Sequence, residues 1–152
     1  MRSIIDSVLS TMLVILMSVM VINVLWQVFS RYILGVPSSF TDELARFLLI
    51  WVGVLGASYA SGKKMHIAIN LTSTRMSPRN QRLLSAINSL IIVGFVLAVL
   101  VVGGSNLVHM TFILEQYSPA LQIPLAVVYL VLPISGLLII YYKLSDLYYT
   151  SR

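Results

Sequence analysis

Few side chains in this sequence could bind a metal, ligate a haem or carry a coupling proton. Its 152 residues include five acidic residues, two histidines and no cysteine. Thiolate ligands and thiol redox chemistry are therefore excluded, and with them the four-helix oxidoreductases that exchange a disulfide with quinone. His66 lies in a basic connection and His109 near the far end of an apolar run, so the two are too far apart to share a haem iron.

The acidic residues are also placed unfavourably for ion coupling. A small transporter that works alone usually keeps an ionisable group deep in the membrane, where a coupling ion binds. Here the acidic residues fall at or beyond the ends of the apolar runs, at Asp6, Asp42, Glu43, Glu115 and Asp146. No phosphate loop, nucleophile arrangement or metal-spaced cluster accompanies them. We therefore predict a chain that is not an enzyme, with no catalytic, substrate-binding or metal site and no cofactor.

One charged group does have helical spacing. Arg46 lies four residues after Asp42 and three after Glu43, so on a helix the three side chains can form one local cluster. Ser39 or Thr41 is expected to cap this helix, and the acidic pair then lies where the helix dipole favours negative charge. Two roles stay open for the cluster, which either caps the helix or contacts another subunit.

Four long stretches without a charged side chain must position these residues: 7–30, 47–62, 83–114 and 116–142. A bilayer core about 30 Å thick needs about 20 apolar residues in a helix that rises about 1.5 Å per residue. The second stretch is short, but its helix can extend back to residue 40. We predict an all-α membrane protein with a single domain over 1–152 and four transmembrane helices, at about 7–30, 40–62, 79–114 and 124–145.

Basic residues crowd the connection between the second and third predicted helices. They are Lys63, Lys64, Arg75, Arg79 and Arg82. By the positive-inside rule, this connection and both termini are cytoplasmic. We expect a short interfacial segment between helices 2 and 3, where these side chains contact anionic phospholipid headgroups. This placement accounts for the net charge of +5, so we predict no nucleic-acid partner.

Uncharged polar side chains mark one face of the first helix. Asn23, Gln27 and Ser30 recur there with helical spacing. Polar groups in lipid are costly unless they are paired, so this face is expected to contact protein. Contact with other helices of this chain and contact with a partner both remain open.

Three further patterns predict local geometry. Gly103-Gly104 interrupts the third helix, and Pro133 removes the hydrogen bond to the Tyr129 carbonyl, which should kink the fourth. Four tyrosines near the end of the chain are expected to form a cytoplasmic aromatic belt: Tyr141, Tyr142, Tyr148 and Tyr149.

A stripe of small residues on the second helix predicts close helix packing. Gly53, Gly56, Ala57 and Ala60 recur on one face, and such stripes let helix backbones approach closely within lipid. The second helix is therefore expected to be a central packing element.

The most specific pattern covers residues 42–67. An acidic-x-x-Arg start is followed by an aromatic, Trp-containing helix with Gly-Ala, and then by a basic-x-His-Ile segment. Glu43, Arg46, Trp51, Gly56, Ala57 and His66 occupy these places. The pattern resembles the small membrane subunit of tripartite ATP-independent periplasmic (TRAP) transporters, the DctQ-like family. The resemblance extends over essentially the whole chain, with a departure at Asn70, where the family often has Asp.

This resemblance implies a bacterial inner-membrane, multi-pass subunit of a sodium-coupled symporter for organic acids such as C4-dicarboxylates or sialic acid. It implies two protein partners, a large membrane subunit that holds the substrate and sodium sites, and a periplasmic binding protein that docks on the pair. This chain would then be a tilted four-helix bundle that acts as a fixed scaffold. The structural or partner-interface candidates are Asp42, Glu43, Arg46, Trp51, Gly53, Gly56, Ala57 and His66.

Two other classes were weighed against this interpretation. A stand-alone small transporter is disfavoured because deep carboxylates are missing, and a membrane anchor of a redox complex is disfavoured because ligands are missing. Trp51 is expected to pack or to face lipid, and His66 to order the cytoplasmic turn through a hydrogen bond.

Overall fold

The computed structural model describes residues 2–36, 38–63 and 78–150. Its helices are α1 (Arg2–Tyr32), α2 (Ser39–Gly62), α4 (Pro78–Val96), the π-helix η1 (Leu97–Gly103), α5 (Gly104–Ile113), α6 (Leu125–Tyr129) and α7 (Val131–Thr150). Four segments are long and apolar enough to cross a membrane: Arg2–Tyr32, Ser39–Gly62, Ile87–Ile113 and Leu125–Asp146. The prediction of an all-α protein with four spans is confirmed.

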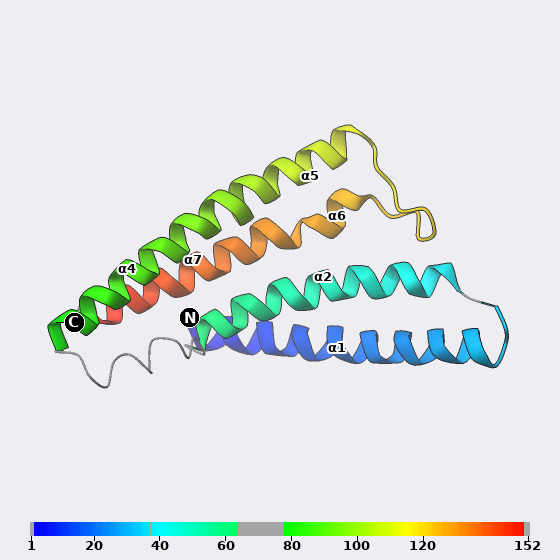
Figure 1. The fold of residues 1–152 in the computed structure, drawn as a ribbon, viewed down its shortest axis with the longest axis horizontal. Helices are drawn as coiled ribbons and strands as arrows, with labels where there is room; N and C mark the ends of the chain where they lie inside the picture. The colour runs from blue at the N-terminus through cyan, green and yellow to red at the C-terminus, as the bar shows by residue number, and fades with distance from the viewer. Residues whose placement is uncertain (1, 37, 64–77, 151–152) are drawn as a thin grey trace.

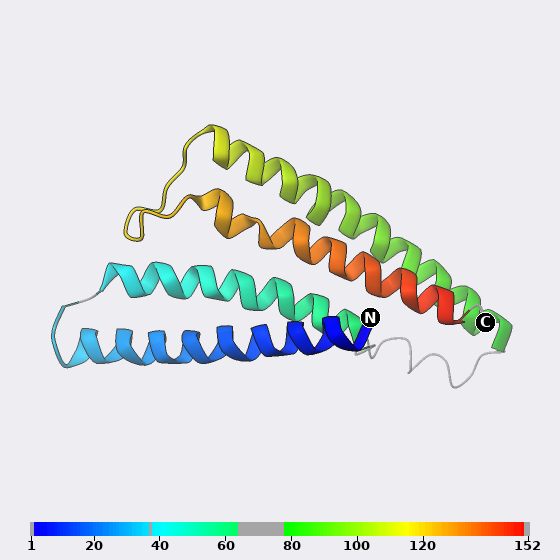
Figure 2. The same ribbon diagram turned by 180° about the vertical axis from the view of Figure 1, so that it is seen from behind.

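The four spans lie side by side in one layer (Figures 1 and 2). α1 packs on α2, α2 packs on α7, and α7 packs on α4 and η1, while α5 packs on α6. The extensive contacts in the described part of the chain are therefore all between neighbours in the layer. This single layer leaves its two faces open to lipid or to another protein.

α1 begins and α7 ends at the same end of the layer, which we call the termini end (Figure 1). The connections at 33–38 and 114–124 both lie at the opposite end, which we call the loop end. Four consecutive spans must place their connections alternately at the two ends of the layer in this way. The predicted segment between the second and third spans, at 64–77, lies outside the described residues.

Two helices are longer than predicted, and one helix is capped by another residue. α1 begins at Arg2 instead of residue 7, where the Arg2 side chain bonds to Asp146 and to the Gly62 carbonyl, and α7 ends at Thr150 instead of residue 145. α2 is capped by Ser38 and not by Ser39 or Thr41, since the Ser38 side chain accepts a hydrogen bond from the Thr41 amide.

The third and fourth spans are both irregular. The third widens into the π-helix η1, which ends at Gly103, and helical backbone continues through Gly104 without a break. In the fourth, Leu130 separates α6 from α7 three residues before Pro133, and the Ile134 amide lies 3.4 Å from the Leu130 carbonyl. This break lies beside the Tyr129 carbonyl, to which Pro133 has no N–H to donate, and the predicted kink of the helix stays a prediction.

Candidate functional site

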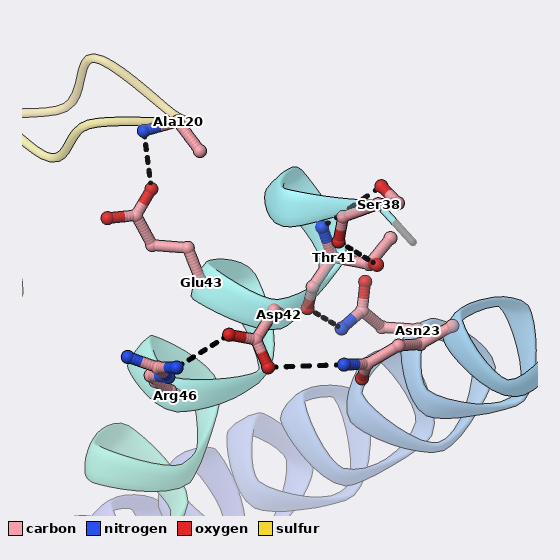
Figure 3. Close-up of polar contacts among 8 residues, drawn as sticks. Asn23, Ser38, Thr41, Asp42, Glu43, Arg46 and Ala120 are labelled. Atoms are coloured by element: carbon pink, nitrogen blue, oxygen red, sulfur yellow. Dashed lines mark hydrogen bonds and ion pairs between the residues drawn. The ribbon is translucent and has the colours of Figure 1, made fainter. Parts of the chain in front are cut away.

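A polar cluster ties α1 to the start of α2 at the loop end (Figure 3). The Asn23 amide donates to the Thr41 carbonyl at 2.7 Å, and Gln27 donates to an Asp42 oxygen at 3.2 Å. Ser30 donates to the Val36 carbonyl at 2.6 Å. The polar face of α1 therefore bonds to its own chain, as the first of the two alternatives predicts.

The charged group on α2 divides into two contacts with different partners (Figure 3). Arg46 pairs with Asp42 at 2.6 Å, one helical turn apart, and the Arg46 side chain remains 74% exposed. Glu43 leaves this pair and reaches the loop 114–124, where its carboxylate accepts hydrogen bonds from the amides of Ala120 at 2.8 Å and Leu121 at 3.1 Å. α1 and α2 form one helical hairpin, and the third and fourth spans form the other. Glu43 thus joins the two hairpins at the loop end, a role that sequence spacing did not predict.

Two further contacts join α2 to the fourth span. The Trp51 indole donates to the Val128 carbonyl at 3.1 Å, and that carbonyl lies in α6, just before the break at Leu130. Deeper in the layer, Ser58 and Ser135 share a hydrogen bond, and Ser135 also donates to the Val54 carbonyl at 2.8 Å. Trp51 is therefore a packing residue with a fixed polar contact. α2 occupies one of the two inner positions in the layer, between α1 and α7.

All glycines in the described spans except Gly103 fall into two groups. An added Cβ at Gly62 would lie 2.8 Å from the Tyr142 ring, at Gly104 it would lie 3.0 Å from Leu132, and at Gly136 2.9 Å from Val101. These glycines allow close contacts inside the subunit.

By contrast, a Cβ at Gly53, Gly56 or Gly94 would meet nothing within 4 Å. Gly53 and Ala57 are exposed, Gly56 is half-buried, and Leu49 beside them is 61% exposed. This small-residue face of α2 points away from Trp51 and Leu55, which lie on the opposite side of the helix. No helix in the described part of the chain covers it.

A second ionic cluster at the termini end was missed by the sequence analysis. Arg2 pairs with Asp146 at 2.8 Å, and the Tyr142 hydroxyl donates to Asp6 at 2.5 Å. Lys63 lies 3.5 Å from Asp6. Tyr142 is fully buried, which corrects its assignment to the cytoplasmic aromatic belt. Partners separated by the whole length of the chain leave no local spacing signal, so only the fold could reveal them.

The structure describes only some of the remaining candidate residues, which are the predicted lipid-headgroup contacts and His66. Lys64, His66 and Arg75 lie outside the described residues, and Arg79 and Arg82 belong to the first turns of α4. Contact of these basic residues and Lys63 with phospholipid headgroups, and a turn-ordering role for His66, stay predictions. Within the described residues, no group of acidic or histidine side chains is arranged to hold a metal ion.

Four spanning helices in one layer, joined by internal polar contacts, define a multi-pass integral membrane protein. The family model described as "Tripartite ATP-independent periplasmic transporters, DctQ component" matches residues 20–152. The chain therefore belongs to the DctQ family of TRAP transporter small permease subunits, which is not a class of enzymes, and it is a protein of the inner membrane. The recognition from sequence is confirmed.

Three relatives agree with this assignment. A putative TRAP transporter small permease protein of Haemophilus influenzae is 26% identical over 89% of this chain and 82% of its own length. The isethionate TRAP transporter permease protein DctMQ of Oleidesulfovibrio alaskensis is 36% identical over 70% of this chain, which spans 17% of that longer protein. The sialic acid TRAP transporter small permease protein SiaQ of Vibrio cholerae is 30% identical over 54% of this chain and 47% of its own.

Proposed function

We propose that this chain is the fixed scaffold subunit of a sodium-coupled TRAP transporter for organic acids. Its partners are a large membrane subunit, which carries the substrate and sodium sites, and a periplasmic binding protein. Relatives named for sialic acid and for isethionate support an organic acid as cargo. The DctMQ name, given to a much longer permease that contains a region similar to this chain, supports the large subunit as partner.

The observation that carries the scaffold role is the open small-residue face of α2. Helices in lipid gain little from apolar burial against each other, so they associate where small side chains allow close backbone contact. This chain uses Gly62, Gly104 and Gly136 in that way internally, and it leaves Gly53 and Gly56 uncovered. We assign this face, with Arg46 at its loop end, to the large subunit.

The hydrogen bonds between spans support the proposal that this subunit is rigid and does not move during transport. Glu43, Trp51 and Ser58 each bond across the boundary between the two hairpins, at three depths in the layer. An element that stays in place while another moves must resist shear, and hydrogen bonds between spans provide such resistance. Among the described spans only the fourth is broken, between α6 and α7, so it has no broken partner with which to form the paired helix breaks that build ion sites in many transporters.

The loop end is our candidate for contact with the binding protein. The positive-inside rule predicts a periplasmic location for the loops 33–38 and 114–124. In the second loop, the contact with Glu43 fixes the amides of Ala120 and Leu121, while the side chains of Tyr117 and Gln122 are exposed. A loop held in one conformation loses little entropy when a partner docks on it.

Uptake measurements test the function itself. The large subunit is reconstituted in liposomes with and without this chain, and substrate uptake is followed with and without a sodium gradient. We expect sodium-dependent uptake only when both chains and the binding protein are present. Sodium-coupled uptake by this chain alone would contradict the scaffold role, and full uptake by the large subunit alone would make this chain dispensable.

The interface is tested separately with Gly56→Leu. A Cβ added there meets no atom of its own chain within 4 Å, so the Gly56→Leu variant should fold and insert normally but co-purify poorly with the large subunit. Gly94→Leu is the matched control, because Gly94 is equally open but lies on α4 at the edge of the layer. If Gly56→Leu co-purifies as well as Gly94→Leu, the α2 face is not the interface.

A further inference from the structure

An amide side chain on α5 faces outwards from the third span, which forms one edge of the layer (Figure 1). Asn106 is exposed, and its side chain makes no hydrogen bond with any described residue. Two other polar side chains in the spans do have partners within the chain, since Asn23 donates to the Thr41 carbonyl and the exposed Ser18 hydroxyl donates to the Val14 carbonyl. Asn106 differs from them in having no internal partner.

Asn106 lies near the middle of the membrane. Two hydrogen bonds between α2 and the fourth span each join residues 77 positions apart: Trp51 with Val128, and Ser58 with Ser135. The same offset puts Leu132 level with Leu55, and a Cβ at Gly104 would lie 3.0 Å from the Leu132 Cβ. Asn106 is two residues, about 3 Å, nearer the loop end, at the depth of Gly53. Gly53 is about 4 Å from the middle of α2, and one apolar leaflet is about 15 Å thick, so the Asn106 amide lies deep in the hydrocarbon.

An unpaired amide at this depth is unfavourable against lipid. A carboxamide carries two N–H donors and a carbonyl acceptor, and hydrocarbon offers a partner to neither. Another protein can supply such a partner, whereas an acyl chain cannot. Gly103, one turn before Asn106, is also exposed and has no side chain, so a neighbouring helix can approach closely enough to form a hydrogen bond with Asn106. The surface around Asn106 therefore fits a protein partner better than lipid.

Three successive residues of α7 show on which side of the layer the third span lies. Ile134 lines an apolar groove that α7 forms with α1 and α2, Ser135 bonds to Ser58 of α2, and a Cβ at Gly136 would lie 2.9 Å from Val101 of η1. Each residue turns a helix by about 100°. Seen from α7, the groove therefore lies to one side of α2 and η1 lies to the other. The layer bends at α7, and the third span is displaced to the side opposite the groove.

Asn106 and the small-residue face of α2 point to this same side. The α2 face points away from the groove, because Trp51 and Leu55 on the other side of the helix line the groove. Asn106 is two residues, or about 200°, from Gly104, which contacts the fourth span, so its side chain points away from that span. A partner that lies on this side of the layer can therefore contact both surfaces at one depth in the membrane.

We infer that the large membrane subunit extends across this side of the layer from α2 to α5, and that one of its polar groups forms a hydrogen bond with the Asn106 amide. The inference rests on the proposed function, which places the large subunit on the small-residue face of α2. One partner then accounts for both surfaces, since Asn106 and Gly53 lie on one side and at one depth. Gly94 of α4 lies about 18 Å nearer the termini end than Asn106 and is not part of this contact.

Photo-crosslinking in the complex of the two membrane subunits tests the contact. A benzophenone amino acid replaces one residue at a time in the full-length chain. At position 106 it should capture the large subunit. At position 134, where Ile134 is 48% exposed but lies on the groove side, it should not. Capture of only lipid or of a second copy of this chain at position 106 would overturn the inference, and so would equal capture of the large subunit at both positions.

Asn106→Leu tests the hydrogen bond itself. The variant should leave the stability of the isolated subunit in micelles unchanged or raised, because it removes an unpaired amide. It should weaken association with the large subunit about three- to tenfold, the usual effect of one hydrogen bond between membrane helices. Ser18→Leu is the matched control, because Ser18 is also exposed but its hydroxyl already bonds within α1, and it should leave association unchanged.

The outcomes separate this inference from the proposed function. If Gly56→Leu weakens association and Asn106→Leu does not, the inference fails while the proposed function stands. If neither variant weakens association, both fail. A loss of stability in isolated Asn106→Leu would also overturn the inference, because it would show that Asn106 has a partner inside its own chain.

Discussion

The two kinds of glycine give the sharpest prediction, because the same substitution should have opposite effects at two positions. At Gly136 of α7, an added Cβ would lie 2.9 Å from a Val101 methyl and 3.0 Å from the Leu100 Cβ. Real side chains almost never approach so closely, so α7 must move away from η1. At Gly56 of α2, the same atom meets nothing within 4 Å.

The magnitude follows from two terms. Replacing glycine by leucine inside a helix gains up to about 1 kcal/mol from backbone propensity at either position. Forcing extra carbons into a packed contact costs about 1–3 kcal/mol, and more when backbone must shift. Only Gly136→Leu incurs this second term. We therefore expect Gly136→Leu to destabilise the isolated subunit by about 2 kcal/mol and Gly56→Leu to leave it unchanged or slightly more stable.

Unfolding of the isolated subunit in detergent micelles, by titration with a denaturing detergent, measures both variants on one scale. Co-purification with the large subunit is then measured for each. We expect each variant to fail in a different measurement: Gly136→Leu lowers the stability of the subunit, and Gly56→Leu lowers its co-purification with the large subunit. Equal stability of the two variants would refute the assignment of Gly136 to an internal contact, and a less stable Gly56→Leu would show that α2 packs differently from the structure.

Three further predictions concern the contacts between hairpins and the topology. Glu43→Ala should speed amide hydrogen exchange at Ala120, because that amide loses its acceptor. Trp51→Phe should destabilise the subunit by about 1 kcal/mol, the usual contribution of a single hydrogen bond, measured by the same detergent titration. In intact cells, an impermeant thiol reagent should label Val36→Cys and not Ser3→Cys, and no native cysteine interferes.

Matched variants control these experiments. Glu115→Ala removes another acidic side chain near the same loop, and it should not change exchange at Ala120. Trp26→Phe alters a Trp that is 53% exposed, and it should leave stability nearly unchanged. If exchange rises equally in both glutamate variants, Glu43 does not hold the loop. If both tryptophan variants lose the same stability, the bond to Val128 contributes nothing. Labelling of Ser3→Cys from outside would invert the topology.

Much of the fold was predictable because lipid imposes constraints that act on short stretches of sequence. Each charge-free run had to become a helix, since no other open structure satisfies backbone groups in a bilayer. The expectation of a disruption near Pro133 followed from a missing N–H, a property of one residue. The family was recognisable from the residues between Asp42 and Ile67, which lie close together in the sequence.

Contacts between distant residues were not predictable in the same way. The spacing of Glu43 and Arg46 suggested a single cluster, yet Glu43 bonds to a loop 77 residues away at Ala120. The small-residue pattern on α2 was visible, but the sequence could not show that Gly136 is covered and Gly53 is open. That distinction depends on which helix lies beside which.

The sequence by itself determined the number of spans, the class of protein and the family, because hydropathy, charge and motif are local properties. Only the tertiary structure decided that the spans form a single layer, that Arg2 pairs with Asp146, and that one face of α2 remains open. The physical reason is that apolar side chains have nearly the same free energy against lipid as against another helix. Hydropathy therefore predicts that a helix spans the membrane, whereas the choice of its neighbours depends on close packing and on hydrogen bonds between residues far apart in the chain.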